Sequence, residues 1–179
     1  AMRTTTILML SLLALAASWR LLPHPDNMTP VMAVALFAGL WLKQPLLRIA
    51  APIGVMLVSD LLIGFHDTMV FVYVAMLVPV LAAPLLKGRR APAYAGMAIA
   101  NALVFFLVTN AGVWLVSGMY SPGLEGLLQS YVMGLPFLWK SLAGDLFFTL
   151  VFYHAFSLAS QADASRAGAV AEAARHKQY

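Results

Sequence analysis

Residues 45–65 have the sequence PLLRIAAPIGVMLVSDLLIGF, a predominantly apolar stretch close in length to the roughly 20 residues that cross a bilayer as a helix. Lys43 precedes this stretch, whereas His66 and Asp67 follow it. Basic residues collect on the cytoplasmic side of membrane proteins. The stretch therefore predicts a transmembrane helix that begins at a cytoplasmic loop and ends at an outer loop.

Five similar stretches occupy most of the remaining chain. Hydrophobic residues make up 62% of the 179 residues and charged residues 10%, whereas a soluble domain has about 25% charged residues. The composition predicts an integral membrane protein, and we expect an all-α, polytopic bundle of six transmembrane helices. The predicted spans are Thr5–Leu22, Pro30–Leu42, Pro45–Phe65, Thr68–Leu86, Pro92–Val116 and Pro136–Leu158.

The first two spans differ from the others. Arg3, the apolar run 7–13 and the Ala-Leu-Ala sequence at 14–16 resemble a signal peptide. The apolar region continues to Leu22, however, and so approaches the roughly 20 residues needed to span a bilayer. We therefore expect a first transmembrane helix. The second span is short for a crossing, and its Ala and Gly residues favour close contact with neighbouring helices.

The connections between the spans alternate in charge. The basic residues lie in the second and fourth connections, at the start of the third span and in the C-terminal tail: Lys43, Arg48, Lys87, Arg89, Arg90, Arg166, Arg175 and Lys177. The first, third and fifth connections instead hold His24, Asp26, Asn27, His66, Asp67, Tyr120, Glu125 and Tyr131. We therefore predict that both termini are cytoplasmic. This topology accounts for the net charge of +4, so no nucleic-acid partner is predicted.

The chain is predicted to form one transmembrane domain over residues 1–160, followed by a polar cytoplasmic tail over residues 161–179. The tail is rich in Ala and predicts an exposed helix. In the fifth connection, apolar residues at helical spacing between Leu124 and Met133 predict a short interfacial helix that is separate from the last span.

Several ionisable or amide side chains fall inside the predicted spans, where burying a charge costs roughly 2.5–3.5 kcal/mol. Asp60, Asn110 and Lys140 lie toward the outer ends of their spans. They favour a pocket that opens outward beneath the first, third and fifth connections. Structural roles compete with this interpretation. Asp60 and Lys140 could form an ion pair, and Asp145 could accept hydrogen bonds from side chains four residues away on the same helix face.

The predicted substrate site combines such side chains with polar and aromatic residues of the outer connections. Aromatic side chains near a membrane interface serve as anchors, but they also offer stacking surfaces for a flat ligand. Arg20 and Lys140 interrupt the charge pattern and are the best electrostatic candidates. The candidate substrate-binding residues are Arg20, His24, Asn27, Asp60, His66, Asp67, Asn110, Trp114, Tyr120, Tyr131 and Lys140.

The absence of Cys excludes disulfides, thiolate metal sites and Cys nucleophiles. His24, His66 and Asp67 are competent metal ligands, but their spacing matches no strong metal motif. Hydrogen bonds to a polar ligand are therefore the preferred interpretation, and we predict no resident metal and no cofactor.

Three segments carry a family resemblance: Arg20–Pro30, Ser59–His66 and Thr109–Trp114. With its six predicted helices and polar outer connections, the chain resembles the substrate-binding S components of energy-coupling factor transporters. More closely, it is similar to an uncharacterised S-component-like family of bacterial membrane proteins. The resemblance implies an S-component-like bundle in the bacterial inner membrane that takes up a vitamin or a similar micronutrient.

The resemblance also implies a partner and one candidate solute. Small residues of the first helix of S components contact a transmembrane coupling subunit, and Ala14 and Ser18 have that spacing here. The chain has no Walker A phosphate loop, so uptake would use a partner with ATPases or proceed without ATP. Cobalamin is one candidate solute. His24 or His66 would then be the available cobalt ligand, because the cysteine of some S-component-like proteins is absent.

Two other functions stay open. The chain could be a structural assembly subunit of the rod-shape protein type, which binds protein partners and no small ligand. It could also be an intramembrane enzyme that uses Asp60, His66, Asp67 or Asp145 as an acid or a base. No Ser–His or His–Glu motif of recognised spacing supports catalysis, so we predict a binding or transport protein without enzymatic activity.

Overall fold

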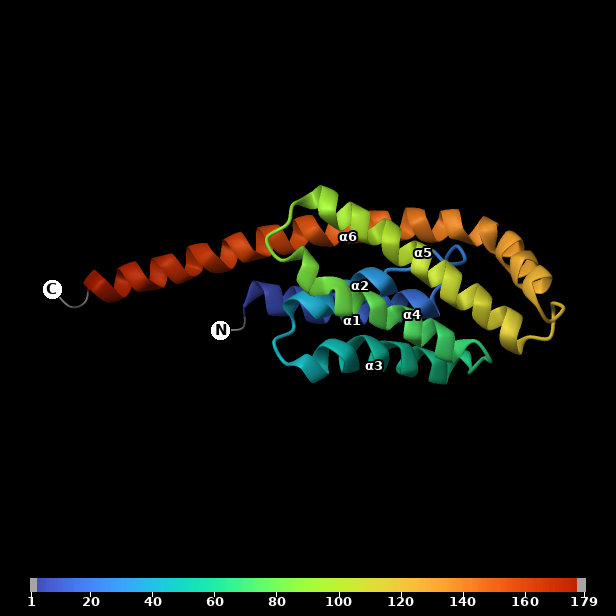
Figure 1. Ribbon diagram of the computed structural model, residues 1–179. Helices are drawn as coiled ribbons and strands as arrows, with labels where there is room; N and C mark the ends of the chain where they lie inside the picture. The colour runs from blue at the N-terminus through green and yellow to red at the C-terminus, as the bar shows by residue number, and fades with distance from the viewer. Residues whose placement is uncertain (1–2, 177–179) are drawn as a thin grey trace.

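The computed structural model describes residues 3–176, and every regular element in this range is helical (Figure 1). The elements are α1 (Thr4–Leu21), α2 (Val31–Trp41), α3 (Pro45–Ile63), α4 (Met69–Ala82), the 3-10 helix η1 (Ala83–Leu86), α5 (Ala91–Val116) and α6 (Leu124–His176). The all-α prediction is confirmed. Lys177, which belongs to the predicted basic tail, lies outside the described residues.

Five helical segments are long and apolar enough to cross a membrane: α1, α3, α4 together with η1, α5 and α6. The fold is therefore that of a membrane-embedded helical protein. The exception is α2, whose 11 residues extend only about 16 Å at 1.5 Å per residue. The hydrocarbon core of a bilayer is about 30 Å thick. Where the sequence predicts six spans, the structure has five long helices and one short one.

Prolines explain why α2 begins late. The chain between α1 and α2 contains Pro23, Pro25 and Pro30, and Pro30 occupies the position just before the first residue of α2. A proline has no backbone N–H and disfavours the helical conformation in the residue before it. Residues 22–30 therefore follow an irregular path, and the helix starts only at Val31.

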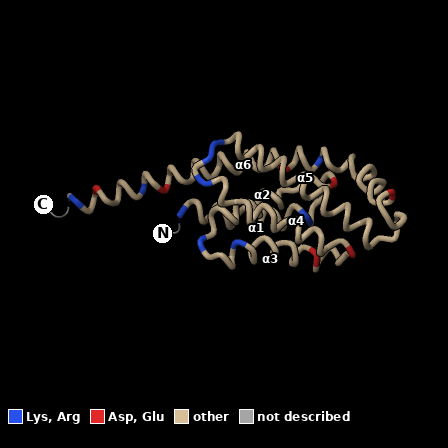
Figure 2. Tube along the Cα trace, in the orientation of Figure 1, with Lys and Arg blue, Asp and Glu red and all other residues tan. Residues whose placement is uncertain are grey.

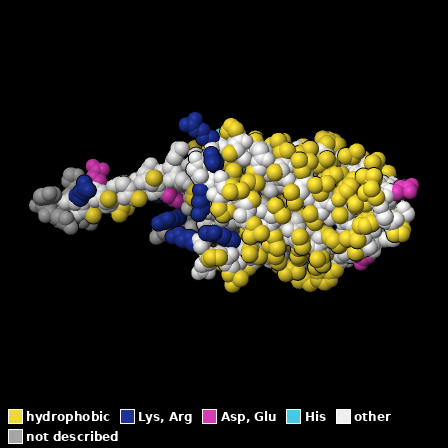
Figure 3. All heavy atoms as spheres, viewed as in Figure 1, with side chains coloured by type: hydrophobic (Ala, Val, Ile, Leu, Met, Phe, Trp, Pro, Cys, Tyr) yellow, Lys and Arg dark blue, Asp and Glu magenta, His cyan; other side chains and the backbone are white. Residues whose placement is uncertain are grey.

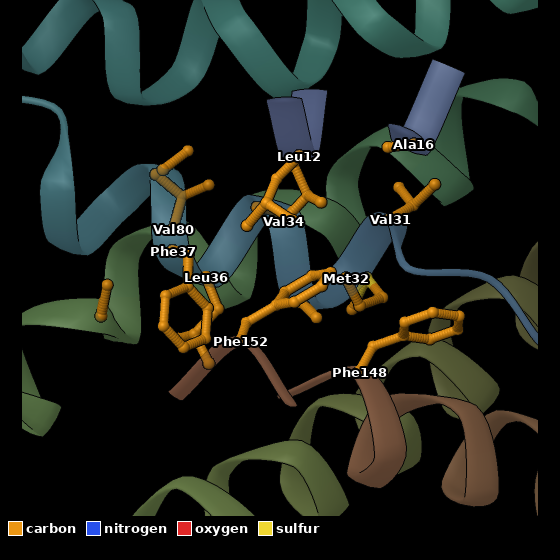
Figure 4. Packing of buried hydrophobic residues seen from close by; sticks show 14 of the residues in the cluster. Leu12, Ala16, Val31, Met32, Val34, Leu36, Phe37, Val80, Phe148 and Phe152 are labelled. Atoms are coloured by element: carbon orange, nitrogen blue, oxygen red, sulfur yellow. The ribbon is translucent and has the colours of Figure 1, made fainter. Parts of the chain in front are cut away.

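The short helix α2 lies at the centre of the bundle. Nine of its 11 residues, Val31–Gly39, are buried. The helix contacts α1, α3, α4 and α6. Figure 4 shows Leu12 of α1 on one side of α2 and Phe148 and Phe152 of α6 on the other. A helix that is apolar on every face suits such a position, and its neighbours shield it from lipid.

A glycine permits the closest contact between α2 and α4. A Cβ atom added to Gly39 would lie 2.6 Å from the carbonyl oxygen of Val80 and 2.7 Å from the Cβ of Ala83. Both distances are shorter than van der Waals contact. Any larger residue at this position would therefore push the two helices apart.

The prediction of a separate interfacial helix before the last span is wrong, because α6 runs without interruption from Leu124 to His176. Pro136 lies inside α6, where it removes one backbone hydrogen bond and favours a bend without ending the helix. Figure 1 shows that α6 curves near its start and that its C-terminal part projects beyond the bundle.

The projecting part of α6 is tied to the start of α1. The carboxylate of Asp163 accepts hydrogen bonds from the backbone N–H groups of Thr4 (2.7 Å) and Thr5 (3.1 Å). The first N–H groups of a helix have no intrahelical partner, and Arg3 provides no side-chain cap. Asp163 therefore caps α1 from the opposite end of the sequence.

Charge separates along the long axis of the bundle. Lys and Arg gather at the end from which the tail projects, whereas acidic residues mark the opposite end as well as the tail itself (Figure 2). Between the two ends of the bundle, apolar side chains cover the visible face (Figure 3). The basic connections thus share one end of the bundle with the N-terminus.

Gly39→Ala is expected to destabilise the bundle by about 1–3 kcal/mol, the usual cost of overpacking a close-packed site. Gly54→Ala is the matched control, because a Cβ atom at Gly54 meets nothing within 4 Å and alanine has the higher helix propensity. Denaturant unfolding in detergent, followed by circular dichroism, measures both variants. Equal stability of the two would contradict the close packing of α2 on α4.

Candidate functional site

A cavity of about 670 Å³ lies at the end of the bundle opposite the basic connections. Its lining comes from all six α-helices and from the connections 22–30, 64–68 and 117–123, which we call the polar connections. Small-molecule sites typically occupy roughly 300–1,000 Å³. The cavity is therefore large enough to hold a small organic ligand.

Burial divides the lining into a mouth and a floor. Asp26, Asn27 and His66 of the polar connections are exposed, whereas Met32 of α2 and Asp145 of α6 are buried. The cavity thus extends from the exposed connections into the interior of the helical bundle.

The structure brings together six of the eleven predicted site residues. Arg20, His24, Asn27, His66, Asn110 and Tyr120 line the cavity. The other five predicted residues, Asp60, Asp67, Trp114, Tyr131 and Lys140, are not part of the lining.

Asp60 lies behind the cavity wall, where it holds Arg20. The Nη2 atom of Arg20 is 2.6 Å from Asp60 Oδ1, and the hydroxyl of Tyr73 donates to Asp60 Oδ2 at 2.6 Å. Asp60 is fully buried, whereas the side chain of Arg20 keeps 15% of its exposure. Asp60 therefore forms its ion pair with Arg20. The pairing of Asp60 with Lys140 that the sequence allowed is wrong.

Arg20 has further partners on α3. Its Nη1 group donates to the hydroxyl of Ser59 and to the backbone carbonyl of Met56 (3.3 Å). Two of its three nitrogens are thus engaged, which fixes the guanidinium at the cavity wall. A buried charge is stable only with such partners.

The first polar connection is anchored to the helices beside it. The indole N–H of Trp19 donates to the backbone carbonyl of Met28 at 2.9 Å. A Cβ atom added to Gly144 of α6 would lie 3.2 Å from the Cα of Met28. Because both neighbours belong to helices, the irregular segment is held in a fixed position against α1 and α6.

Within this connection, a hydrogen bond to the backbone determines the tautomer of the His24 imidazole. Its Nδ1 atom is 2.7 Å from the carbonyl oxygen of Leu22. A carbonyl can only accept, so Nδ1 carries the proton in a neutral ring and Nε2 remains an acceptor. The second imidazole of the mouth, that of His66, has Nδ1 2.9 Å from the Thr68 hydroxyl.

Asn110 reaches the cavity from α5. Its side-chain amide donates to the Phe106 carbonyl at 2.9 Å, and its own backbone carbonyl accepts from Ser130 of α6 at 2.8 Å. A Cβ atom at Gly134 would overlap the Asn110 side chain. The Asn110 side chain thus packs against Gly134, and its second amide N–H and its amide oxygen make no hydrogen bond to the described residues.

The remaining aromatic and basic predictions have structural partners. Trp114 donates to the Ser121 carbonyl (3.0 Å) and Tyr131 to the Leu107 carbonyl (3.2 Å). The Nζ atom of Lys140 lies 5.8 Å from the centroid of the Phe137 ring, a cation–π distance. Of the three predicted aromatic ligands, Tyr120 alone lines the cavity.

Asp145 was not among the predicted ligands, yet it lines the cavity floor. Its Oδ2 atom is buried and accepts no hydrogen bond from any residue in 3–176. The sequence does single out this position, because Asp145 is the one charged residue of the segment 141–149 and has no Lys or Arg there to pair with. A buried polar atom without a partner is rare in folded proteins and calls for an explanation.

Sequence reasoning also missed the methionines. Five of them line the cavity: Met32, Met56, Met76, Met119 and Met133. An apolar helix residue that faces a cavity has the same sequence pattern as one that faces lipid or core. The flexible, polarisable thioether adapts to ligands of different shape.

The residue clusters considered for metal binding or catalysis are only partly assembled. Among the described residues, no group of three or more His, Cys, Asp or Glu could hold a metal ion, so His24, His66 and Asp67 do not form such a site. Of the acid–base candidates, His66 and Asp145 line the cavity, whereas Asp60 and Asp67 do not.

The predicted partner contacts lie on α1. Ala14 and Ser18 are both exposed and do not line the cavity. They are one helical turn apart, so they share one face of the helix. That face is accessible to another helix.

The comparison with known proteins gives one match. A family model described as "Family of unknown function (DUF6580)" matches residues 1–167. No curated protein matches the chain, and no solved structure does.

Asp60→Ala is expected to destabilise the protein by about 3–5 kcal/mol, the cost of leaving one charge of a buried pair without its partner. Asp67→Ala is the control, because Asp67 is exposed and such changes usually stay within about 0.5 kcal/mol. Thermal unfolding in detergent measures both. Adding Arg20→Ala to Asp60→Ala should cost less than the sum of the single changes, and full additivity would speak against the pair.

Proposed function

The chain belongs to the DUF6580 family, a family of unknown function, and we propose that it binds a small water-soluble nutrient within the membrane and delivers it for uptake. It acts as the substrate-binding subunit of an energy-coupled transporter or as a solitary transporter. The observation that carries the proposal is the cavity of about 670 Å³, with its polar mouth, inside a bundle of apolar helices.

The charge distribution supports binding of the solute from the outer side of the membrane. Basic residues favour the cytoplasmic side of a membrane, and they gather at the end of the bundle away from the cavity (Figure 2). In a bacterial inner membrane, this orientation places both termini in the cytoplasm and the cavity mouth on the outer side. The solute then enters between the connections that carry His24 and His66.

The irregular segment 22–30 supports a solute-binding cavity. Backbone without helical hydrogen bonds is tolerated at membrane depth only where it is buried in protein or lines a cavity. Met28 of this segment is held by Trp19 and lies against Gly144, while its neighbours Asn27 and Thr29 line the cavity. The prolines that keep residues 22–30 from forming a helix thus also leave polar side chains of this segment at the cavity.

The volume favours a vitamin-sized solute over a corrinoid. Pockets of this size hold drug-sized ligands, whereas cobalamin is considerably larger because its corrin ring carries a nucleotide arm. The imidazoles of His24 and His66 are therefore better assigned to hydrogen bonds with a polar solute than to an axial cobalt ligand.

A coupling partner would bind the exposed face of α1. The small side chains of Ala14 and Ser18 allow another helix to approach closely. An assembly subunit of the rod-shape type would also need a protein contact, but it has no use for an open cavity with a polar mouth. The cavity therefore favours solute binding over a purely structural role.

Protein purified from bacterial cells in mild detergent is expected to carry a non-lipid solute, which native mass spectrometry detects as a mass adduct. Val113→Trp should abolish the adduct, because Val113 lines the cavity and the larger indole would project into the space that the solute occupies. Val116→Trp is the matched control, because Val116 is exposed on the same helix and should leave the adduct in place. A wild-type protein without an adduct, or full occupancy in Val113→Trp, would contradict the proposal.

A further inference from the structure

We propose that the carboxylate of Asp145 binds a cationic group of the solute, so that the ligand is a small organic cation such as a protonated amine. The inference rests on the proposed function and specifies the chemical class of its substrate. It starts from a buried carboxylate oxygen that has no partner within the chain.

The position of Asp145 is that of a ligand-binding group. The residue is only 5% exposed, yet it lines the cavity, as do the buried residues Ser141 and Met32. Its Oδ2 atom accepts no hydrogen bond from the described residues. Burying a carboxylate without a compensating partner is strongly unfavourable. A partner that arrives through the cavity removes this penalty.

No basic residue near the cavity is available for this role. Arg20 is the cavity's guanidinium, and Asp60, Ser59 and Met56 already engage it. The Nζ atom of Lys140 lies over the Phe137 ring, and Lys140 does not line the cavity. Within residues 3–176, the single salt bridge between Arg or Lys and an acid is that of Arg20 with Asp60.

The other elements that line the cavity contribute no positive charge at its floor. α2, α3 and α4 supply methionines there, and α5 supplies Phe105, Thr109 and Asn110. The remaining titratable groups, His24, Asp26 and His66, belong to the polar connections at the mouth. Asp145 therefore faces apolar and neutral side chains.

The ionisable groups of the lining favour a cation over an anion. The Arg20 guanidinium is compensated by the Asp60 carboxylate, which leaves Asp145 and Asp26 as uncompensated acids when the imidazoles are neutral. Low-dielectric walls strengthen the field of such charges. A cationic solute gains from this field, whereas an anionic solute is repelled by it.

Aromatic side chains add to the preference for a cation. Phe105, Tyr120 and Phe137 all contribute to the lining. The faces of aromatic rings attract cations, most strongly where water is excluded. A protonated amine held by Asp145 can thus keep its organic part against these rings and the methionine side chains.

Three matched probes test the inference: phenethylamine, its neutral analogue 2-phenylethanol and its acidic analogue 3-phenylpropionate. Binding to the purified full chain is measured by the rise in unfolding temperature in detergent across a concentration series. The wild-type protein should bind phenethylamine more tightly than either analogue. Asp145→Asn should weaken amine binding about 10- to 100-fold, the range for loss of a hydrogen bond to a charged group, and should leave binding of 2-phenylethanol unchanged.

Asp67→Asn is the control, because it removes an exposed carboxylate outside the lining and should keep the preference for the amine. Without any probe, Asp145→Asn should be at least as stable as the wild-type protein, since a buried carboxyl group without a partner has been replaced by a neutral side chain of the same shape. A wild-type protein that binds the three probes equally, or an Asp145→Asn variant that still prefers the amine, would overturn the assignment.

Native mass spectrometry distinguishes failure of the Asp145 assignment from failure of the proposed function. A solute that co-purifies with both the wild-type protein and Asp145→Asn would overturn the role of Asp145 while leaving solute uptake in place. A wild-type protein that carries no solute and binds none of the three probes would refute the proposed function, and the inference with it.

Discussion

A bilayer offers no hydrogen bonds to a polypeptide backbone, and this constraint governs the way the bundle is built. Five helical segments are long and apolar enough to satisfy it by crossing with their backbone hydrogen bonds made internally. The segment 22–42 satisfies it differently. Its helical half, α2, is buried from Val31 to Gly39, and its irregular half is held in place by Trp19 and Gly144. The space that a complete helix would have filled is occupied by the cavity and its polar mouth.

Two carboxylates in this bundle differ in their partners and therefore in their roles. Both oxygens of Asp60 are bonded, one to Arg20 and one to Tyr73, so this acid is part of the wall. Asp145 has the opposite arrangement, with a buried oxygen that no described residue satisfies. Because removing one partner of a buried pair is far more costly than removing an unpaired acid, the same substitution has opposite consequences at the two positions.

Composition and charge were sufficient to predict an all-helical membrane protein with its basic connections at one end, because both properties are averages over long segments. They could not predict the continuity of α6 through Pro136, which depends on local backbone geometry, nor the burial of α2, which depends on its neighbours. For the site, polar residues in an apolar context identified six lining positions. The pairing of Asp60 with Arg20 and the methionine lining depend on distances between helices, which no spacing along the chain specifies. Ligand binding by any of these residues stays a prediction.

The uninterrupted length of α6 has a structural consequence. From Asp145 to Asp163 the helix contains neither Gly nor Pro, and this part is an uninterrupted helical segment about 27 Å long at 1.5 Å per residue. One end carries the unsatisfied carboxylate of the cavity, and the other end caps α1 through Thr4 and Thr5. The position of Asp145 in the cavity and the position of the α1 cap are therefore both set by one stretch of helix. The cavity and the first turn of α1 are thus connected through a single helix that has no break between them.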